Sequence, residues 1–224
     1  MQHEDLPRVT EPVLHSRLLT VKGLLLPAYS HEIRNIISNI KICRDHLDIT
    51  DDKHTRAELL ADIDEQIRFT THTVLQQMDS SVSDGTRQKQ ELRVPEDIAF
   101  HRKLLRTVCR RECISWVDLS GDSFPITSDP ADVLLMLGEY VAAVVLDAPF
   151  FTDENRAITL QTKRKEATGY LVLSGPLPPS WEGDPANRHL PLSGALAEKT
   201  GCSFSVDRRE DRRDVVDIRY QFPL

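Results

Sequence analysis

A long segment, from about residue 14 to about residue 47, repeats its apolar side chains with the period of an α-helix. Its second half places them at alternating spacings of three and four residues: Leu26, Tyr29, Ile33, Ile36, Ile40, Cys43 and Leu47. Its first half has its own stripe, which changes phase at the Leu24-Leu25-Leu26 triplet: Leu14, Leu18, Val21, Leu25 and Ala28. We expect a long helix packed along one face, with Pro27 at a kink or at a fresh helical start.

A second helix is expected after the polar turn at Asp48–His54. The order Thr55-Arg56-Ala57-Glu58 is that of a capping box, whose hydroxyl and carboxylate satisfy the first free amides of a helix. Apolar positions then continue to about Ser80: Leu60, Ile63, Ile67, Val74 and Met78. Two helices joined by so short a turn are antiparallel. Because no other element is expected to cover their apolar faces, we expect two hairpins to form a dimeric four-helix bundle.

One histidine of the first helix points away from this apolar seam. His31 lies two residues from both Tyr29 and Ile33, so it belongs to the outer face. Three polar residues follow it on that face, at i+3, i+4 and i+7: Arg34, Asn35 and Ser38. A histidine in this position, with an amide one turn further on, can react with a molecule that docks from outside.

Two plainer interpretations compete with that one. An exposed helical histidine is usually an ordinary surface residue, which is our interpretation of six others: His15, His46, His54, His72, His101 and His189. The order His-Glu-x-x-His on a helix binds zinc, but the fifth position here is Asn35, a poor zinc ligand. We therefore expect no metal site, and the four cysteines show no metal-finger spacing.

The order Ser30-His31-Glu32-Ile33-Arg34-Asn35 resembles the phospho-accepting box of bacterial two-component histidine kinases, although the proline of that box is replaced by Ile36. The resemblance implies that His31 accepts a phosphoryl group and that Glu32 corresponds to the general base of autophosphorylation. It also implies that Asn35 could orient water against a partner's aspartyl phosphate. Arg34 and Ser38 would meet the partner, Arg34 through its acidic surface or the phosphoryl oxygens. Arg34 fits the description of an ordinary solvated charge equally well.

The pattern changes class after a polar, turn-rich stretch at Ser80–Thr86. We expect two domains, a helical hairpin at 1–81 and an α+β sandwich at 87–224, with one sheet and helices on one face. Its helices are expected from Pro95-Glu96-Asp97, over Ala131–Leu146 behind a Ser128-Asp129-Pro130 cap, and over Ser193–Thr200 before Gly201. Its strands are expected at Ile114–Leu119, Ile158–Thr162, Tyr170–Leu173, Ser203–Val206 and Val215–Phe222.

This order resembles the ATP-binding domain of histidine kinases, but its nucleotide landmarks are lost. The helix that would hold magnesium through an asparagine reads Leu134–Val141 without one. The adenine-reading Asp-x-Gly-x-Gly loop falls at Leu173–Leu177, where Leu173 replaces the aspartate and only Gly175 remains. The glycine-rich lid is replaced by Leu190–Leu196. Phosphoryl transfer from ATP needs such a cradle of amides and a metal ion, so the resemblance implies a degenerate ATPase-like domain that binds no ATP.

Composition excludes two classes of partner. The net charge of -7 argues against a nucleic-acid surface, and the arginines near the end of the chain alternate with acids. The sequence has no apolar run of about 18 or more residues. We expect a cytoplasmic protein that binds neither nucleic acid nor membrane.

An intact histidine box beside an erased nucleotide site resembles the dimeric histidine phosphotransferases of bacterial phosphorelays. The resemblance implies a homodimer that relays a phosphoryl group between His31 and receiver-domain aspartates of response regulators, with Mg²⁺ supplied by the receiver domain. Three alternatives stay open. They are a response-regulator-binding phosphatase or pseudokinase module, an active histidine kinase, and a protein with a purely structural, interacting role.

Overall fold

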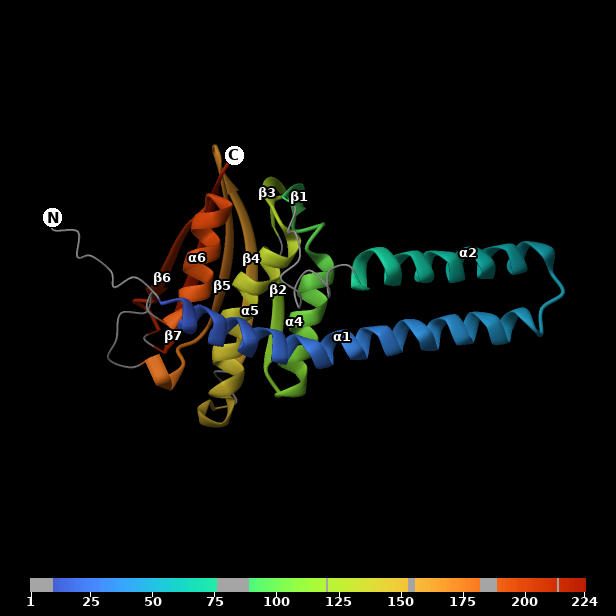
Figure 1. Ribbon diagram of the computed structural model, residues 1–224, viewed down its shortest axis with the longest axis horizontal. Coiled ribbons are helices and arrows are strands. Elements are labelled where there is room, and N and C mark those ends of the chain that lie inside the picture. Colours follow the sequence, from blue (N-terminus) through green and yellow to red (C-terminus); the bar gives the residue numbers. More distant parts are fainter. Residues whose placement is uncertain (1–9, 76–88, 120, 153–155, 182–188, 213) are drawn as a thin grey trace.

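The structure, a computed structural model of the 224-residue chain, describes residues 10–75, 89–119, 121–152, 156–181, 189–212 and 214–224. Two helices, α1 (Glu11–Leu47) and α2 (Lys53–Phe69), form an antiparallel hairpin, and a π-helical stretch (Thr70–Leu75) continues α2. The hairpin projects from an α+β body (Figure 1). The predicted linker and Met78 lie outside the described residues.

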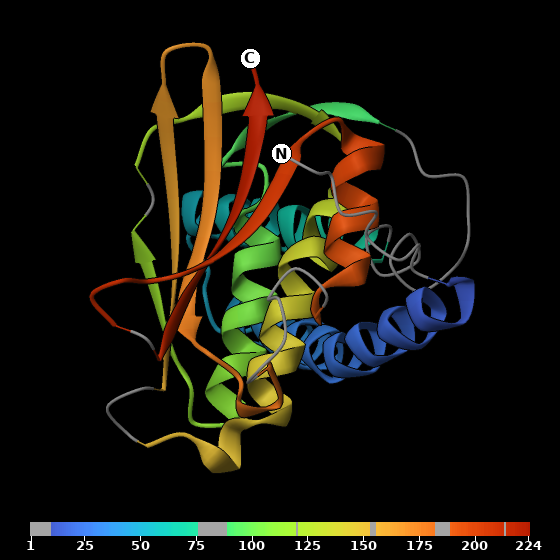
Figure 2. The same ribbon diagram turned by 90° about the vertical axis from the view of Figure 1, so that its left-hand side faces the viewer.

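The body contains the remaining elements in chain order: β1 (Gln90–Val94), α4 (Ala99–Arg111), β2 (Ser115–Leu119), β3 (Phe124–Ser128), α5 (Pro130–Leu146), η2 (Ala148–Phe150), β4 (Ala157–Lys165), β5 (Thr168–Pro176), η4 (Pro179–Trp181), α6 (Pro191–Thr200), β6 (Ser203–Arg208) and β7 (Val215–Pro223). The main sheet has the order β2-β4-β5-β7-β6, and only its β2–β4 pair is parallel. Helices α4, α5 and α6 all lie on one face of this sheet, as predicted (Figure 2).

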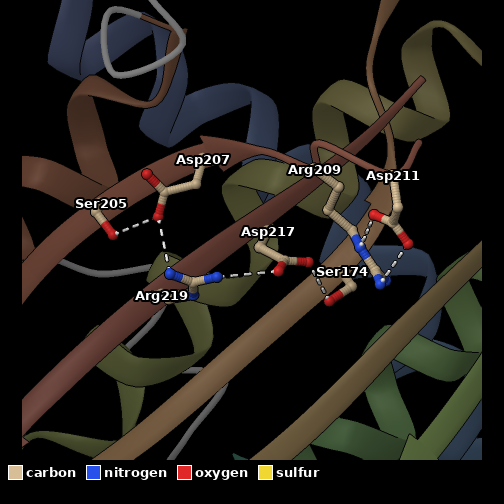
Figure 3. A network of polar contacts seen from close by, with 7 residues as sticks. All are labelled: Ser174, Ser205, Asp207, Arg209, Asp211, Asp217 and Arg219. Carbon is tan, nitrogen blue, oxygen red and sulfur yellow. Dashed lines mark hydrogen bonds and ion pairs between the residues drawn. The ribbon is translucent and has the colours of Figure 1, made fainter. Parts of the chain in front are cut away.

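The opposite face of the sheet is polar. Arg219 on β7 forms ion pairs with Asp207 on β6 at 3.2 Å and with Asp217 at 3.2 Å (Figure 3). Ser174 on β5 extends the network by donating to Asp217 at 2.6 Å. Such a row of paired charges keeps this face in water, so the core lies on the helical side.

Two predicted helix starts are wrong. The N-cap of α2 is Asp52, not Thr55, because the Asp52 carboxylate accepts both the amide of Thr55 at 2.8 Å and its hydroxyl at 2.6 Å. Helix α4 begins at Ala99, not at Pro95. Asp97 belongs instead to a turn, in which its carboxylate accepts the amide of Arg93 at 2.6 Å. Strands β1 and β3, which pair as a separate two-stranded sheet, were not predicted.

Helix α1 is one continuous helix of 37 residues that passes through Pro27. Pro27 and Gly23 are both exposed. In a regular helix the carbonyl of Gly23 would accept a hydrogen bond from the amide of residue 27, but proline has no amide hydrogen. Water can therefore satisfy that carbonyl, and neither a fresh helical start nor a break is needed.

The first half of α1 packs against the body, which contradicts the expectation that nothing else covers the hairpin. It contacts α4, α5 and α6, and its apolar stripe continues without a change of phase: Val21, Leu25, Ala28, Tyr29 and Ile36 are buried. Leu26, predicted to lie in the seam, is 47 % exposed. Gly138 on α5 permits the close approach, since a Cβ there would lie 2.8 Å from Val21 Cγ1. The chain thus has three layers: sheet, body helices and α1.

His101 on α4 is fully buried, so its interpretation as a surface residue is wrong. Neither ring nitrogen has a hydrogen-bond partner among the described residues. Burial alone lowers the pKa of His101 from 6.5 to about 4. The neutral imidazole is therefore part of the core.

This burial predicts acid sensitivity. As the pH falls from about 6.5 to about 4, the unfolded chain binds a proton that folded His101 excludes, so the free energy of unfolding falls by roughly 3 kcal/mol. A His101→Leu variant should lose that part of the pH dependence in urea unfolding, whereas His15→Gln, at an exposed position, should keep it. Equal pH slopes for His101→Leu and the unmodified protein would contradict the assignment.

Candidate functional site

His31 lies on the exposed side of α1, where the helix is about to leave the body. Ile36, little more than one turn later, is the last buried residue of α1. Beyond it, α1 projects outward beside α2 (Figure 1). The imidazole therefore sits at the corner between hairpin and body, open to a molecule that approaches from outside.

The other predicted residues of the outer face are exposed beside it. Arg34, Asn35 and Ser38 are all exposed, and within the described parts of the chain the side chains of Arg34 and Asn35 make no hydrogen bond or ion pair. The Ser38 hydroxyl donates to the carbonyl of Arg34 at 2.9 Å, so it can only accept from a partner in this rotamer. The structure thus brings these residues together with His31 on one accessible surface.

Glu32 is placed differently. Its side chain is 2 % exposed and forms an ion pair with Lys103 Nζ on α4, a lysine that is itself 53 % exposed. Consecutive helical residues point about 100° apart, so Glu32 faces the body while His31 faces water. Action of Glu32 as a general base would require this ion pair to open.

An aromatic cluster joins the hairpin to α4 near the same level. The ring of Phe100 lies 6.1 Å from that of Tyr29 on α1 and 5.6 Å from that of Phe69, the last residue of α2. Both hairpin helices are therefore anchored to one helix of the body. Sequence reasoning missed Phe100 and Lys103. The available signal was Glu32, an acid within a stripe of buried residues, because a buried carboxylate needs a partner.

The region that resembles a nucleotide site is occupied by the chain itself. Leu173 on β5 is fully buried. Tyr140 on α5 donates its hydroxyl to the carbonyl of Pro176 at 3.0 Å, and a Cβ at Gly175 would lie 2.5 Å from that hydroxyl oxygen. The glycine therefore makes room for a tyrosine of the same chain.

A buried carboxylate takes the first free amides of α6. Glu139 on α5 accepts the amide of Ser193 at 2.7 Å and that of Leu192 at 3.1 Å. Burial raises the pKa of Glu139, and the hydrogen bonds from Ser193 and Leu192 oppose that rise. The Ser193 hydroxyl donates to the carbonyl of Met136 at 3.0 Å, which also accepts the hydroxyl of Tyr220 at 2.9 Å. The positive end of α6 is therefore neutralised from within.

Aromatic rings pack between α5 and the segment that leads to α6. Trp181 is buried and stacks on His189, with ring centroids 5.1 Å apart and 9° between the planes. Trp181 also contacts Tyr140, and the centroids of these two rings are 6.0 Å apart. His189, interpreted as a surface residue, is half-buried in this stack.

The described parts of the chain contain neither a group of side chains that could bind a metal ion nor a helix that could span a membrane. There, no group of three or more histidine, cysteine, aspartate and glutamate side chains is placed to hold a metal ion. Among the same residues, no helix is both long and apolar enough to span a bilayer.

No protein-family model matches the sequence, and no curated protein matches it. Solved structures do match. The histidine kinase ThkA in complex with the response regulator TrrA is 18 % identical over 98 % of this chain and 68 % of that chain, with a TM-score of 0.45. The histidine kinase domain of the E. coli osmosensor EnvZ is 12 % identical over 63 % and 92 %, with a TM-score of 0.45. A bacterial phosphotransferase is 14 % identical over 90 % and 96 %, with a TM-score of 0.40.

Proposed function

We propose that the protein is a histidine phosphotransferase, in which His31 accepts a phosphoryl group from a receiver-domain aspartyl phosphate and passes it to another. The observation that supports this most directly is the exposed imidazole of His31, within its box sequence, at the corner of hairpin and body. Arg34 and Asn35 lie on the same open face, where a docking protein would meet them.

The reaction needs little from the chain beyond a neutral, accessible imidazole. A ring nitrogen attacks phosphorus, the nitrogen–phosphorus bond forms, and the bond to the aspartyl oxygen breaks to leave a carboxylate. The proton on the other ring nitrogen can pass to water, because the ring is exposed. Arg34 is placed to approach the phosphoryl oxygens. The receiver domain supplies the Mg²⁺ that neutralises the phosphoryl group.

ATP is disfavoured as the phosphoryl donor, because side chains of the chain itself occupy the region that would correspond to a nucleotide site. The two amides that open α6, in the segment that corresponds to the lid, are already bound to Glu139. Tyr140 occupies the space beside Gly175, and Leu173 offers no polar group to adenine. The residues present do not fit a nucleotide.

We expect no measurable ATP binding, with or without Mg²⁺, in calorimetry of the full chain. A site built around a lost polar contact loses most of its affinity, and here the remaining donors are engaged as well. Micromolar or tighter binding would contradict this and would reopen the kinase alternative.

One experiment separates the candidate functions. The protein is incubated first with labelled ATP and then, separately, with a receiver domain bearing labelled aspartyl phosphate. We expect label on the protein only from the receiver domain. Label on the protein from ATP would indicate a kinase. No label on the protein in either incubation, with no release of free phosphate, would indicate a binding role.

A phosphatase is the second candidate, because Asn35 is exposed one turn after His31 and could orient water. Release of free phosphate without labelled protein would favour it. In that case Asn35→Ala should slow phosphate release, whereas in a transferase the same variant should accept phosphoryl groups at nearly the original rate. Asn39→Ala, at an exposed asparagine one turn after Asn35, serves as the matched control.

A further inference from the structure

We propose that Lys103 of α4 is a positioning residue for His31: its ion pair with Glu32 locks α1 onto the body, so that a docking protein meets hairpin and body in one fixed corner. This inference rests on the proposed function, which supplies the docking protein. It assigns to Lys103 an effect on docking and not on the chemical step.

The lock lies beside the reactive group. Glu32 follows His31 directly and is the charged member of the buried stripe of α1. Beyond Ile36, the last buried residue of α1, the helix projects away from the body beside α2 (Figure 1). The Glu32–Lys103 pair is therefore close to the place where the hairpin would pivot if it moved relative to the body.

The two partners of this pair differ in their surroundings. Glu32 is buried and Lys103 is about half exposed. Loss of the lysine leaves a buried carboxylate without its ion-pair partner, which is much more costly than leaving an exposed ammonium in water. The carboxylate would regain hydration if α1 lifted from α4. Removing Lys103 therefore favours an open arrangement of hairpin and body.

Phe100 provides the second attachment between the hairpin and α4. It contacts Tyr29 and Phe69, one residue from each hairpin helix, a single turn before Lys103. The Glu32 oxygen that pairs with Lys103 accepts no hydrogen bond from the described residues, so the pair acts through charge and adds a point of attachment beside the aromatic contacts. Together, the two kinds of contact fix the position of α4 relative to the hairpin. A protein that approaches His31 therefore meets the same surface of the body each time.

A fixed corner lowers the cost of docking. A protein that touches both the projecting part of the hairpin and the body binds more tightly when their relative position is already fixed, because any ordering on docking reduces its affinity. Once docked, it presents its phosphoryl group to the same imidazole. Loss of the lock should therefore raise KM for the phosphorylated receiver domain and leave kcat nearly unchanged.

The chain offers a matched control. Lys199 on α6 pairs with the buried Asp132 on α5 at 2.6 Å, so it too is a partly exposed lysine on a buried acid. Lys199→Met breaks the same kind of pair between two helices of the body and leaves the Glu32–Lys103 pair in place. It should cost stability in the same way without changing the corner.

The test uses the full chain with a receiver domain bearing aspartyl phosphate. We expect Lys103→Met to raise KM about tenfold, equivalent to about 1.4 kcal/mol, with kcat within about twofold. Lys103→Arg, which keeps the charge, should have the KM of the unmodified protein, and so should Lys199→Met. The proposal would be overturned if Lys199→Met lowered kcat/KM as much as Lys103→Met does. An unchanged KM in Lys103→Met would overturn it as well.

A second readout does not depend on phosphoryl transfer. Nitroxide labels on exposed Cys113 in the body and on Asp62→Cys in α2, with Cys43→Ser and dilution by unlabelled protein, report the distance between body and hairpin. We expect one narrow distribution that broadens in Lys103→Met but not in Lys199→Met. A narrow distribution in all variants refutes the lock, whereas an unphosphorylated wild-type protein refutes only the proposed function.

Discussion

Replacement of His31 with alanine is expected to abolish phosphoryl acceptance from a receiver domain while leaving the fold intact. The imidazole is exposed, so its loss removes no packing, and the change in the free energy of unfolding should stay within about 0.5 kcal/mol. Acceptance is measured as acid-labile label on the protein, and stability by urea unfolding of the same preparation.

His46→Ala is the matched control, because His46 is an exposed histidine of the same helix. It should accept label at the original rate. Acid-labile phosphate on the His31→Ala protein would end the assignment of His31 as acceptor. Loss of acceptance in both variants would point to a general effect on α1 instead.

The elements that sequence reasoning located are those whose local signals agree with their packing. Helix α5 is apolar on nearly every side and is buried on nearly every side. Its cap was also predicted, since Asp129 accepts the amide of Ala131 at 2.8 Å. Gly201 ends α6 with φ of 74°, which a glycine adopts without strain. In each case one short stretch contains the whole signal.

The errors arose where distant residues decide the outcome. Leu26 fits the helical period, but the body covers a neighbouring face of α1. Strands β1 and β3 were not predicted, and they pair only with each other, as a separate two-stranded sheet. His101 and Glu32 are polar residues on buried faces, and no local pattern predicts which polar residue the core admits.

The candidate site divides in the same way. The exposed face around His31 could be predicted, because it depends on the period of one helix. The Glu32–Lys103 pair could not, because it joins two elements that meet only through the tertiary fold. The same holds for Glu139 and the amides of α6, which neutralise one another across the body.

The hairpin retains an apolar face that the body does not cover, and we expect it to form a homodimer. On α1 this face contains three exposed apolar side chains, Leu19, Leu26 and Ile37, and α2 exposes Leu60 and Ile67. Those on α1 are separated by 7 and 11 residues, which are whole numbers of turns, so they share one face. Burial of such a face against a second copy is the economical solution for an antiparallel pair of helices.

Ile37→Glu should therefore convert the dimer to a monomer in sedimentation velocity of the full chain at micromolar concentration. Ile37 is 60 % exposed, so the glutamate is tolerated in the monomer, whereas two copies would place like charges together in an apolar interface. The full chain is needed, because an isolated hairpin would expose Val21, Leu25 and the other residues that the body covers.

Ile42→Glu is the control that separates assembly from docking. Ile42 is 54 % exposed on the same helix but lies about 140° around it from Ile37. It follows His31 by 11 residues, or three turns, so it lies on the docking face. We expect Ile42→Glu to remain dimeric and to bind receiver domains more weakly. A monomeric wild-type protein, or equal dissociation by both substitutions, would contradict the dimer face, because only one of the two faces can be the interface between copies.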